Sequence, residues 1–182
     1  MPHLPSLPDD ARLLHVFRGQ RETAKPLLAY HEALMRGPSP LSVAERELLA
    51  AYASGLNQCS YCHGAHRAAA EAFGIAEGTL EDLLGDPESA AVDPKLQPLL
   101  RYVKKLTEAP ARMTQADADA VYAAGWDEQA LHDAVAVCAL FNFMNRYVEG
   151  LGIQSDETYF DEAGRRLHDV GYRGLLPLLE QD

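Results

Sequence analysis

The stretch NQCSYCHGAH, residues 57–66, concentrates residue types that can do chemistry. Cys59 and Cys62 are three positions apart, His63 directly follows the second cysteine, and His66 lies four positions beyond it. Three kinds of site have this spacing. C-x-x-C-H is the haem-attachment pattern, a cysteine pair with a histidine can be half of a zinc site, and C-x-x-C at a helix start can be a redox pair.

Haem and structural zinc each need features that the sequence does not clearly supply. Haem is attached after export, and the start of the chain, MPHLPSLPDDARLLHVF, lacks the basic region of a secretory signal. Structural zinc has four ligands, usually in two spaced pairs, whereas the chain has one C-x-x-C pair. Cys138 and His66 could complete a zinc site only if the fold brought them together. We therefore favour the redox interpretation, and expect no metal and no cofactor.

The physical chemistry of a helix start favours a reactive thiol pair. We expect Cys59 at the N-terminal end of a helix and Cys62 one turn further, where unpaired backbone N–H groups and the helix dipole stabilise anions. A lower thiol pKa and a higher reactivity follow. Positions 59, 62 and 66 share one helical face, so that His66 can reach Cys62 and act as its base. Two buried, inert thiols are the alternative.

A carboxylate on the preceding helix could complete a proton relay. Glu47 lies on a helical stripe of small residues, Ala44, Ala51 and Ser54, which lets another helix approach closely. Such a carboxylate is a candidate buried acid, with a raised pKa if it has no cationic partner. The alternative is a partly solvated surface residue.

The elements that must position these residues are predicted to be helices, because Pro and Gly interrupt helical patterns and no period-2 strand is convincing. Ser42 followed by Glu45 has the S-x-x-E spelling of a capping box, which predicts a helix over 42–56. The segment 127–149 contains AVAVCALFNFM, so apolar that it belongs at the centre of a bundle or against another subunit. The other expected helices span 10–18, 22–36, 60–73, 79–84, 94–108, 114–124 and 155–169, with a loop at 86–94 and a looser tail to 182.

Composition and charge exclude several classes of partner. With 182 residues, 47% of them hydrophobic, the chain can bury the core of a single domain over 1–182. The formal net charge of −11 disfavours nucleic acid and anionic membrane surfaces as partners. No apolar run reaches the roughly 18 residues that span a bilayer. Without a secretory signal, we expect the protein in the cytoplasm, where thiols stay reduced.

The spacing E-x11-C-x-x-C-x3-H, from Glu47 to His66, resembles the motif of the alkylhydroperoxidase D (AhpD) family, which shares an all-helical fold with the carboxymuconolactone decarboxylases. The segment ERELLAAYASGLNQCSYCHGAH resembles the AhpD core, and FNFMNRYVEGLGI resembles the longer branch called peroxidase-related proteins. The resemblance implies an all-α, AhpD-like bundle of about eight to nine helices. Its core would cover about 35–110, and helices over 114–182 would serve packing and oligomerisation.

The function that this resemblance implies is a thiol-dependent peroxidase with Cys62, Cys59, His66 and Glu47 as catalytic residues. Cys62 would attack the peroxide and become a sulfenic acid, while Cys59 would donate a proton and then close the disulfide. His66 and Glu47 would relay protons. An external dithiol, of the lipoyl or thioredoxin-like type, would reduce the disulfide again. The family favours homo-oligomers, as trimers or hexamers, with dimers as an alternative.

Other functions remain open beside this one. Tyr61 stands where some family members place a histidine directly before the second cysteine, so that one proton-handling group is missing; His63 is expected to point away from Cys62. A decarboxylase or lyase acting on a ring lactone is one rival, and a non-enzymatic metal- or redox-sensing module is another. Cys138 is expected to be a buried core thiol, and His31 a solvated or packing residue.

Overall fold

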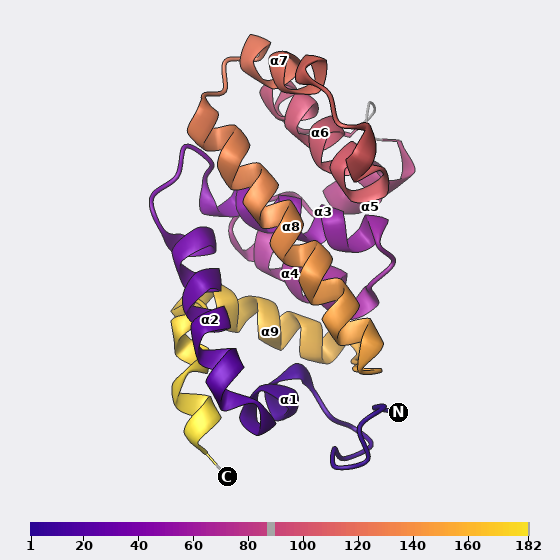
Figure 1. Cartoon of the computed structure of the whole chain (residues 1–182), viewed down its shortest axis with the longest axis vertical. Coiled ribbons are helices and arrows are strands. Elements are labelled where there is room, and N and C mark those ends of the chain that lie inside the picture. The colour runs from indigo at the N-terminus through magenta and orange to yellow at the C-terminus, as the bar shows by residue number, and fades with distance from the viewer. Residues whose placement is uncertain (87–89, 182) are drawn as a thin grey trace.

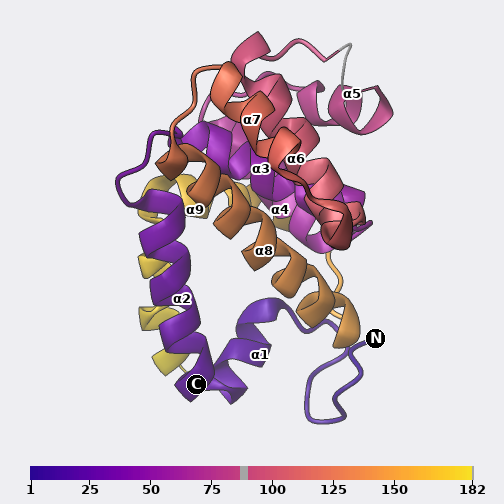
Figure 2. The same cartoon turned by 45° about the horizontal axis from the view of Figure 1, so that its top comes forward.

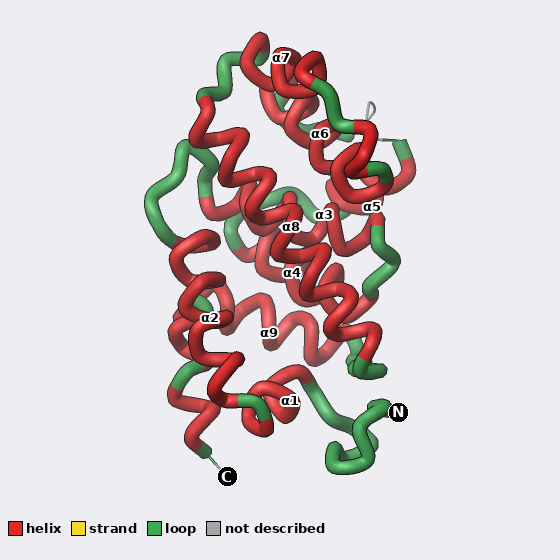
Figure 3. The backbone as a smooth tube through the Cα atoms, viewed as in Figure 1, coloured by secondary structure: helices red, strands yellow, loops and turns green. Residues whose placement is uncertain are grey.

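The computed structural model describes residues 1–86 and 90–181, within which the chain forms nine α-helices, four short 3₁₀ helices and no strand (Figure 3). The predicted all-α fold is confirmed. The α-helices are α1 (Leu13–Gly19), α2 (Arg21–Arg36), α3 (Val43–Leu56), α4 (Ser60–Ala72), α5 (Thr79–Gly85), α6 (Gln97–Glu108), α7 (Gln115–Ala123), α8 (Glu128–Gly150) and α9 (Glu157–Val170). The 3₁₀ helices are η1 (Pro94–Leu96), η2 (Pro110–Arg112), η3 (Arg173–Leu175) and η4 (Pro177–Glu180).

The helices are distributed along the long axis of the molecule, as Figure 1 shows. Helices α5, α6 and α7 gather at one end, and α1, α9 and the C-terminal segment at the other, with α3, α4 and α8 between them; the turned view in Figure 2 agrees. The apolar helix predicted over 127–149 is α8, which begins after its cap Asp127 and packs against α3, α4 and α6. None of the described helices combines the length and apolarity needed to cross a membrane.

Local sequence signals place α3 and α4 side by side. Ser42 and Glu45 form the predicted capping box, in which the Ser42 N–H donates to the Glu45 carboxylate at 2.6 Å, and α3 therefore begins at Val43. At the other end of α3, Gln58 adopts a left-handed conformation with φ 57°, which is uncommon for a residue other than glycine. The chain reverses there, so that α4 begins directly after Cys59 and packs along α3.

Helix α9 also packs closely against α4, because glycines remove side chains from the contact. A Cβ atom on Gly164 of α9 would come within 2.6 Å of the backbone carbonyl carbon of Ala68, far inside the normal contact distance. Gly64 of α4 leaves space for the ring of Phe160 in the same way. This close approach lets α9 contribute side chains to the surroundings of the cysteine motif.

The segment after α9 is not the looser tail that the sequence predicted. Tyr172 and Leu179 are buried, and η3 and η4 pack against α2 and α1 respectively. The backbone N–H groups of Tyr172 and Arg173 both donate to the carboxylate of Glu32 on α2, at 2.9 and 3.1 Å. The sequence of this segment lacks the apolar spacing of an ordinary α-helix. Buried apolar side chains and the hydrogen bonds to Glu32 hold it in place.

Helix α1 starts later than predicted, and part of a predicted loop lies outside the described residues. Helix α1 begins at Leu13 rather than at residue 10, with the backbone N–H of Arg12 donating to His15 Nδ1 at 2.9 Å. Part of the loop predicted over 86–94 falls at 87–89, which lie outside the described residues; from Pro94 the chain forms η1 and then α6.

Candidate active site

The predicted relay residues Glu47 and His66 are hydrogen-bonded to each other between α3 and α4. His66 Nδ1 lies 2.6 Å from Glu47 Oε2, and both side chains are buried. A carboxylate only accepts, so Nδ1 carries the proton, and the lone pair of Nε2 is left free to accept another. In this arrangement His66 could act as a general base, and the Glu47 carboxylate would hold its ring in place.

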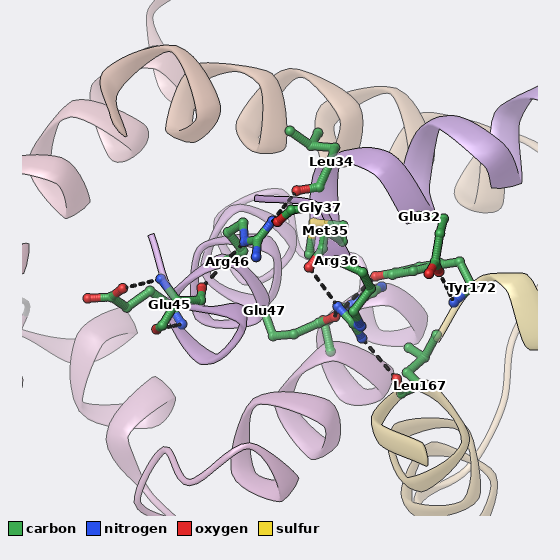
Figure 4. A network of polar contacts seen from close by, with 12 residues as sticks. Glu32, Leu34, Met35, Arg36, Gly37, Glu45, Arg46, Glu47, Leu167 and Tyr172 are labelled. Atoms are coloured by element: carbon green, nitrogen blue, oxygen red, sulfur yellow. Dashed lines mark hydrogen bonds and ion pairs between the residues drawn. The ribbon is translucent and has the colours of Figure 1, made fainter. Parts of the chain in front are cut away.

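Glu47 has two further partners that the sequence did not reveal. Arg36 Nη1, from the last turn of α2, lies 2.7 Å from Glu47 Oε1. The hydroxyl of Tyr172 donates to the same oxygen at 3.2 Å. Figure 4 shows Arg36 and Glu47 pointing toward one another, while Arg46 turns away to backbone carbonyls at the C-terminal end of α2. Both carboxylate oxygens of Glu47 are thus occupied.

These partners decide the charge state of Glu47. Burial would raise the pKa of this carboxyl, but the charge and hydrogen bond of His66, and then those of Arg36, outweigh burial and lower the pKa below its ordinary value. Glu47 is therefore a carboxylate at neutral pH. The sequence predicted a buried acid with a raised pKa if it lacked a cationic partner. The burial is confirmed, and the pKa falls because His66 donates a hydrogen bond to Glu47 and Arg36 is a cationic partner.

Cys59 and Cys62 lie where the sequence placed them, at the cap and in the first turn of α4, and both thiols are free and buried. Their hydrogen bond to each other, burial, and the charge of an ionised Cys59 raise the pKa of Cys62 well above its ordinary value; a hydrogen bond from Asn145 opposes the rise. The prediction that the helix start lowers the thiol pKa is therefore wrong for Cys62. A negative charge on one sulfur disfavours a second charge on the other, and burial disfavours both. A base must therefore take the proton of the Cys62 thiol before it can react.

A cavity of about 100 Å³ lies against Cys62 and His66. Because roughly 10–15 Å³ is enough for one water molecule, this cavity can hold something much larger than water. Cys59 and Glu47 are not part of its lining, so a ligand would meet Cys62 and His66 with their two partners behind them. Most of the wall is apolar and comes from α1, α2, α8 and α9, including Leu13, Phe17, Leu28, Phe141, Met144 and Leu167.

Two neighbours of Cys62 in the sequence serve the structure. The Tyr61 hydroxyl lies 2.7 Å from the Tyr159 hydroxyl and accepts a hydrogen bond from the backbone of Leu13 at 3.2 Å. Burial and Tyr159 raise the pKa of Tyr61 well above its ordinary value, so that it does not replace a histidine in moving protons. His63 donates from Nδ1 to the carbonyl of Ala51 on α3 at 3.0 Å and does not line the cavity, which agrees with the prediction that it points away from Cys62.

His31 is a cavity residue that the sequence did not single out. It is buried rather than solvated, and its Nδ1 donates to the Leu27 carbonyl at 2.8 Å within α2. Burial lowers the pKa of His31 to about 4, although the backbone hydrogen bond acts in the opposite direction. At neutral pH it therefore presents an uncharged ring to the cavity. Its sequence surroundings carry no partner spacing that could have revealed this role.

Cys138 is the buried core thiol that the sequence predicted. It is fully buried on α8, its sulfur lies 3.3 Å from Thr107 Oγ1, and it does not line the cavity. In the part of the chain that the structure describes, no group of three or more His, Cys, Asp or Glu side chains is placed to hold a metal ion.

Comparison with known proteins agrees with this fold. Residues 21–105 match the model of the carboxymuconolactone decarboxylase family. The structure of an uncharacterized peroxidase-related protein from Silicibacter sp. TM1040 is 28% identical, with a TM-score of 0.76, covering 81% of this chain and 78% of that one. An uncharacterized peroxidase-related protein from Ralstonia eutropha JMP134, described as an alkylhydroperoxidase AhpD core, is 25% identical, with a TM-score of 0.75, covering 82% and 78%. Over residues 21–105 the chain is thus similar to the carboxymuconolactone decarboxylase family, and its fold is similar to that of AhpD-like peroxidase-related proteins.

The site combines residues from inside and outside the matched span. His31, Arg36, Glu47 and the cysteine motif lie within 21–105, whereas Tyr159 and Tyr172 come from the C-terminal part. No curated protein sequence gives a significant match to the chain. These matches name decarboxylases as well as peroxidase-related proteins, so the reaction must be argued from the site itself.

Proposed function

We propose that the protein is a thiol-dependent peroxidase that reduces organic hydroperoxides through a dithiol/disulfide cycle of Cys62 and Cys59. The observation that carries this proposal is the placement of Cys62 and His66, one helical turn apart, on the wall of a mostly apolar cavity. Glu47 orients His66 from behind, and Cys59, at the cap of the same helix as Cys62, is close enough to raise the pKa of the Cys62 thiol. A nucleophile, its base and a resolving thiol are thereby assembled in one place.

The first half of the cycle oxidises Cys62. The Nε2 lone pair of His66 accepts the proton of the Cys62 thiol, whose raised pKa makes such a base necessary. The thiolate attacks the terminal oxygen of the hydroperoxide, the S–O bond forms, and the O–O bond breaks. The alkoxide that leaves takes the proton from His66 and departs as an alcohol. Two electrons have moved from sulfur to the peroxide, and Cys62 is a sulfenic acid.

The second half of the cycle closes the disulfide. The Cys59 sulfur attacks the sulfenic sulfur of Cys62, and hydroxide leaves with the Cys59 proton as water. The neighbouring thiol protects Cys62 from further oxidation. An external dithiol must then reduce the disulfide, and the lipoyl or thioredoxin-like type remains the prediction. Because Cys62 is only 4% exposed, a slender dithiol that enters the cavity suits the site better than a flat protein surface. The predicted homo-oligomer also stays a prediction.

The variant Cys59→Ser tests the order of these events. Without the second thiol, the sulfenic acid on Cys62 has no internal partner and should persist after one equivalent of an organic hydroperoxide. Dimedone should then label Cys62, and the intact mass should rise by one adduct. The double variant Cys59→Ser/Cys62→Ser is the control and should stay unlabelled. Failure of Cys59→Ser to form the adduct, despite consuming peroxide, would mean that Cys62 is not the residue attacked.

One observation favours a second candidate function. The family model that matches residues 21–105 bears the name of the carboxymuconolactone decarboxylases, and an apolar cavity with a histidine base could also take a ring lactone. Such a lyase does not depend on paired thiols. Activity on a lactone that survives in Cys59→Ser would favour it.

A further inference from the structure

The charge of the cavity wall differs from that of the whole protein. The chain carries a formal net charge of −11, yet no aspartate or glutamate lines the cavity among the described residues. One arginine, Arg166, does. It lies on the face of α9 that also supplies Tyr159, Ala163 and Leu167, at the i, i+4, i+7 and i+8 positions of one helical stripe. The wall of the mostly apolar cavity therefore carries one cationic side chain and no acidic one, although the protein as a whole is negatively charged.

Arg166 is also free to bind a ligand. It is partly exposed, and within the described residues its side chain has no hydrogen bond or ion pair. The acidic residues one turn away on α9 do not neutralise it: Glu162 is exposed and forms no ion pair with it, and Asp169 pairs with His168 at 2.8 Å. An arginine fork is well suited to bind a planar carboxylate.

The other polar groups of the wall are already engaged. The hydroxyls of Tyr61 and Tyr159 bond to each other, and that of Tyr172 donates to Glu47. His31 is hydrogen-bonded to the backbone through one nitrogen and is uncharged at neutral pH. An incoming ligand therefore finds a reacting end at Cys62 and His66 and one charged group at Arg166, with apolar side chains between them.

Building on the proposed peroxidase function, we propose that the substrate is a hydroperoxide with a long apolar chain that ends in a carboxylate, and that Arg166 binds the carboxylate. Tyr159, which contacts the neighbour of Cys62, and Arg166 are two turns apart on α9, or about 10 Å along the helix. The carboxylate and the hydroperoxide of the substrate are separated by a comparable distance. The partly exposed position keeps the guanidinium hydrated in the free protein, so that an unpaired charge is not buried there.

A purely structural role for Arg166 makes a different prediction. If its aliphatic stem only covers the apolar wall, its loss would affect charged and neutral substrates alike. Linoleic acid hydroperoxide and its methyl ester separate the two cases, because they share the chain and the reacting group and differ in charge. Arg165→Gln is the matched control, since Arg165 is exposed, bonds to its own helix at the Asp161 carbonyl, and does not line the cavity.

For Arg166→Gln we expect kcat/KM for the acid to fall about tenfold, the usual effect of losing one charged hydrogen-bond pair in a partly exposed site, with the methyl ester unaffected. Arg165→Gln should leave both substrates at the wild-type value. Equal losses for the acid and the ester in Arg166→Gln, or no loss for the acid, would overturn the proposal.

A binding measurement separates this proposal from the proposed function. Decanoate and decanol lack a peroxide, so that their calorimetric titration reports the cavity without the thiol chemistry. Decanoate should bind about tenfold more weakly to Arg166→Gln than to wild type, whereas decanol should bind both equally. If decanoate binding depends on Arg166 but neither hydroperoxide is consumed, the carboxylate site stands and the peroxidase function is wrong. If the ester is consumed and decanoate binds both proteins equally, the function stands and the carboxylate site is wrong.

Discussion

Replacing Cys62 with serine should reduce the consumption of an organic hydroperoxide to the rate measured without protein. A serine hydroxyl cannot be oxidised to a sulfenic acid, so that both the electron transfer and the disulfide that follows it are lost. His66 and Glu47 keep their hydrogen bond in this variant, and the cavity keeps its shape. The measurement is peroxide consumption with excess dithiothreitol as the dithiol donor.

Cys138→Ala provides the matched control for this loss. Cys138 is the third free thiol of the chain, is fully buried, and lies outside the cavity lining. Its removal should leave the rate per folded molecule unchanged. If Cys62→Ser keeps the wild-type rate, or if Cys138→Ala is the variant that loses it, the nucleophile is misassigned. Loss of peroxide consumption with lactone turnover retained would point to the lyase.

Glu47→Gln should lower the free energy of unfolding by about 3 kcal/mol, the lower part of the range for breaking a buried ion pair from one side. The neutral amide leaves the guanidinium of Arg36 without its counter-charge. This loss is costly because the Arg36 side chain is only 13% exposed. The pH dependence has a definite sign. Because the folded-state pKa of Glu47 is lowered, its contribution is present above the ordinary pKa of a glutamate and is lost as the pH falls through the folded-state value.

The same substitution should reduce peroxide turnover about a hundredfold, the lower part of the range for general base catalysis. The glutamine amide can donate to His66 Nδ1 and so select the tautomer that carries its proton on Nε2, which cannot accept one from Cys62. Denaturant unfolding measures the first effect, and initial rates under native conditions measure the second.

Two controls accompany Glu47→Gln. Glu45→Gln makes the same chemical change two residues away on α3, where glutamine can still complete the capping box, and should alter neither stability nor rate. The double variant Arg36→Met/Glu47→Gln removes the unpaired charge and should regain much of the stability, but not the activity. A Glu47→Gln protein as stable and as active as wild type would remove this carboxylate from the account.

Much of the fold could be predicted because its signals are local. The capping box at Ser42, the cap at Asp127 and the glycines that follow helices determined most of the boundaries. The shared helical face of Cys59, Cys62 and His66 could be predicted for the same reason, because the helical period sets which positions lie on one face. The spacing of Glu47 and His66 gave their pairing only through the resemblance to a family, because nothing in the spacing itself shows how α3 and α4 pack.

The parts of the site that could not be predicted depend on long-range contacts. Tyr172 lies in a segment without a clear helical pattern and reaches Glu47 only through the fold, and Arg36 resembles any basic residue at a helix end. The pKa of Cys62 was predicted in the wrong direction for a related reason. A helix start stabilises an exposed thiolate, but here burial and the neighbouring sulfur of Cys59 outweigh that effect. The sequence shows the neighbouring sulfur but not the depth at which the pair is buried.

The central claim is that Cys62 and Cys59 together give two electrons to one hydroperoxide. The most direct measurement is the number of free thiols, with peptide mapping by mass spectrometry, after fully reduced wild-type protein reacts with one equivalent of an organic hydroperoxide. The chain has three cysteines, all free in the structure. The account predicts that one thiol, Cys138, remains and that a Cys59–Cys62 disulfide is found. Three remaining thiols with the peroxide unconsumed would contradict it.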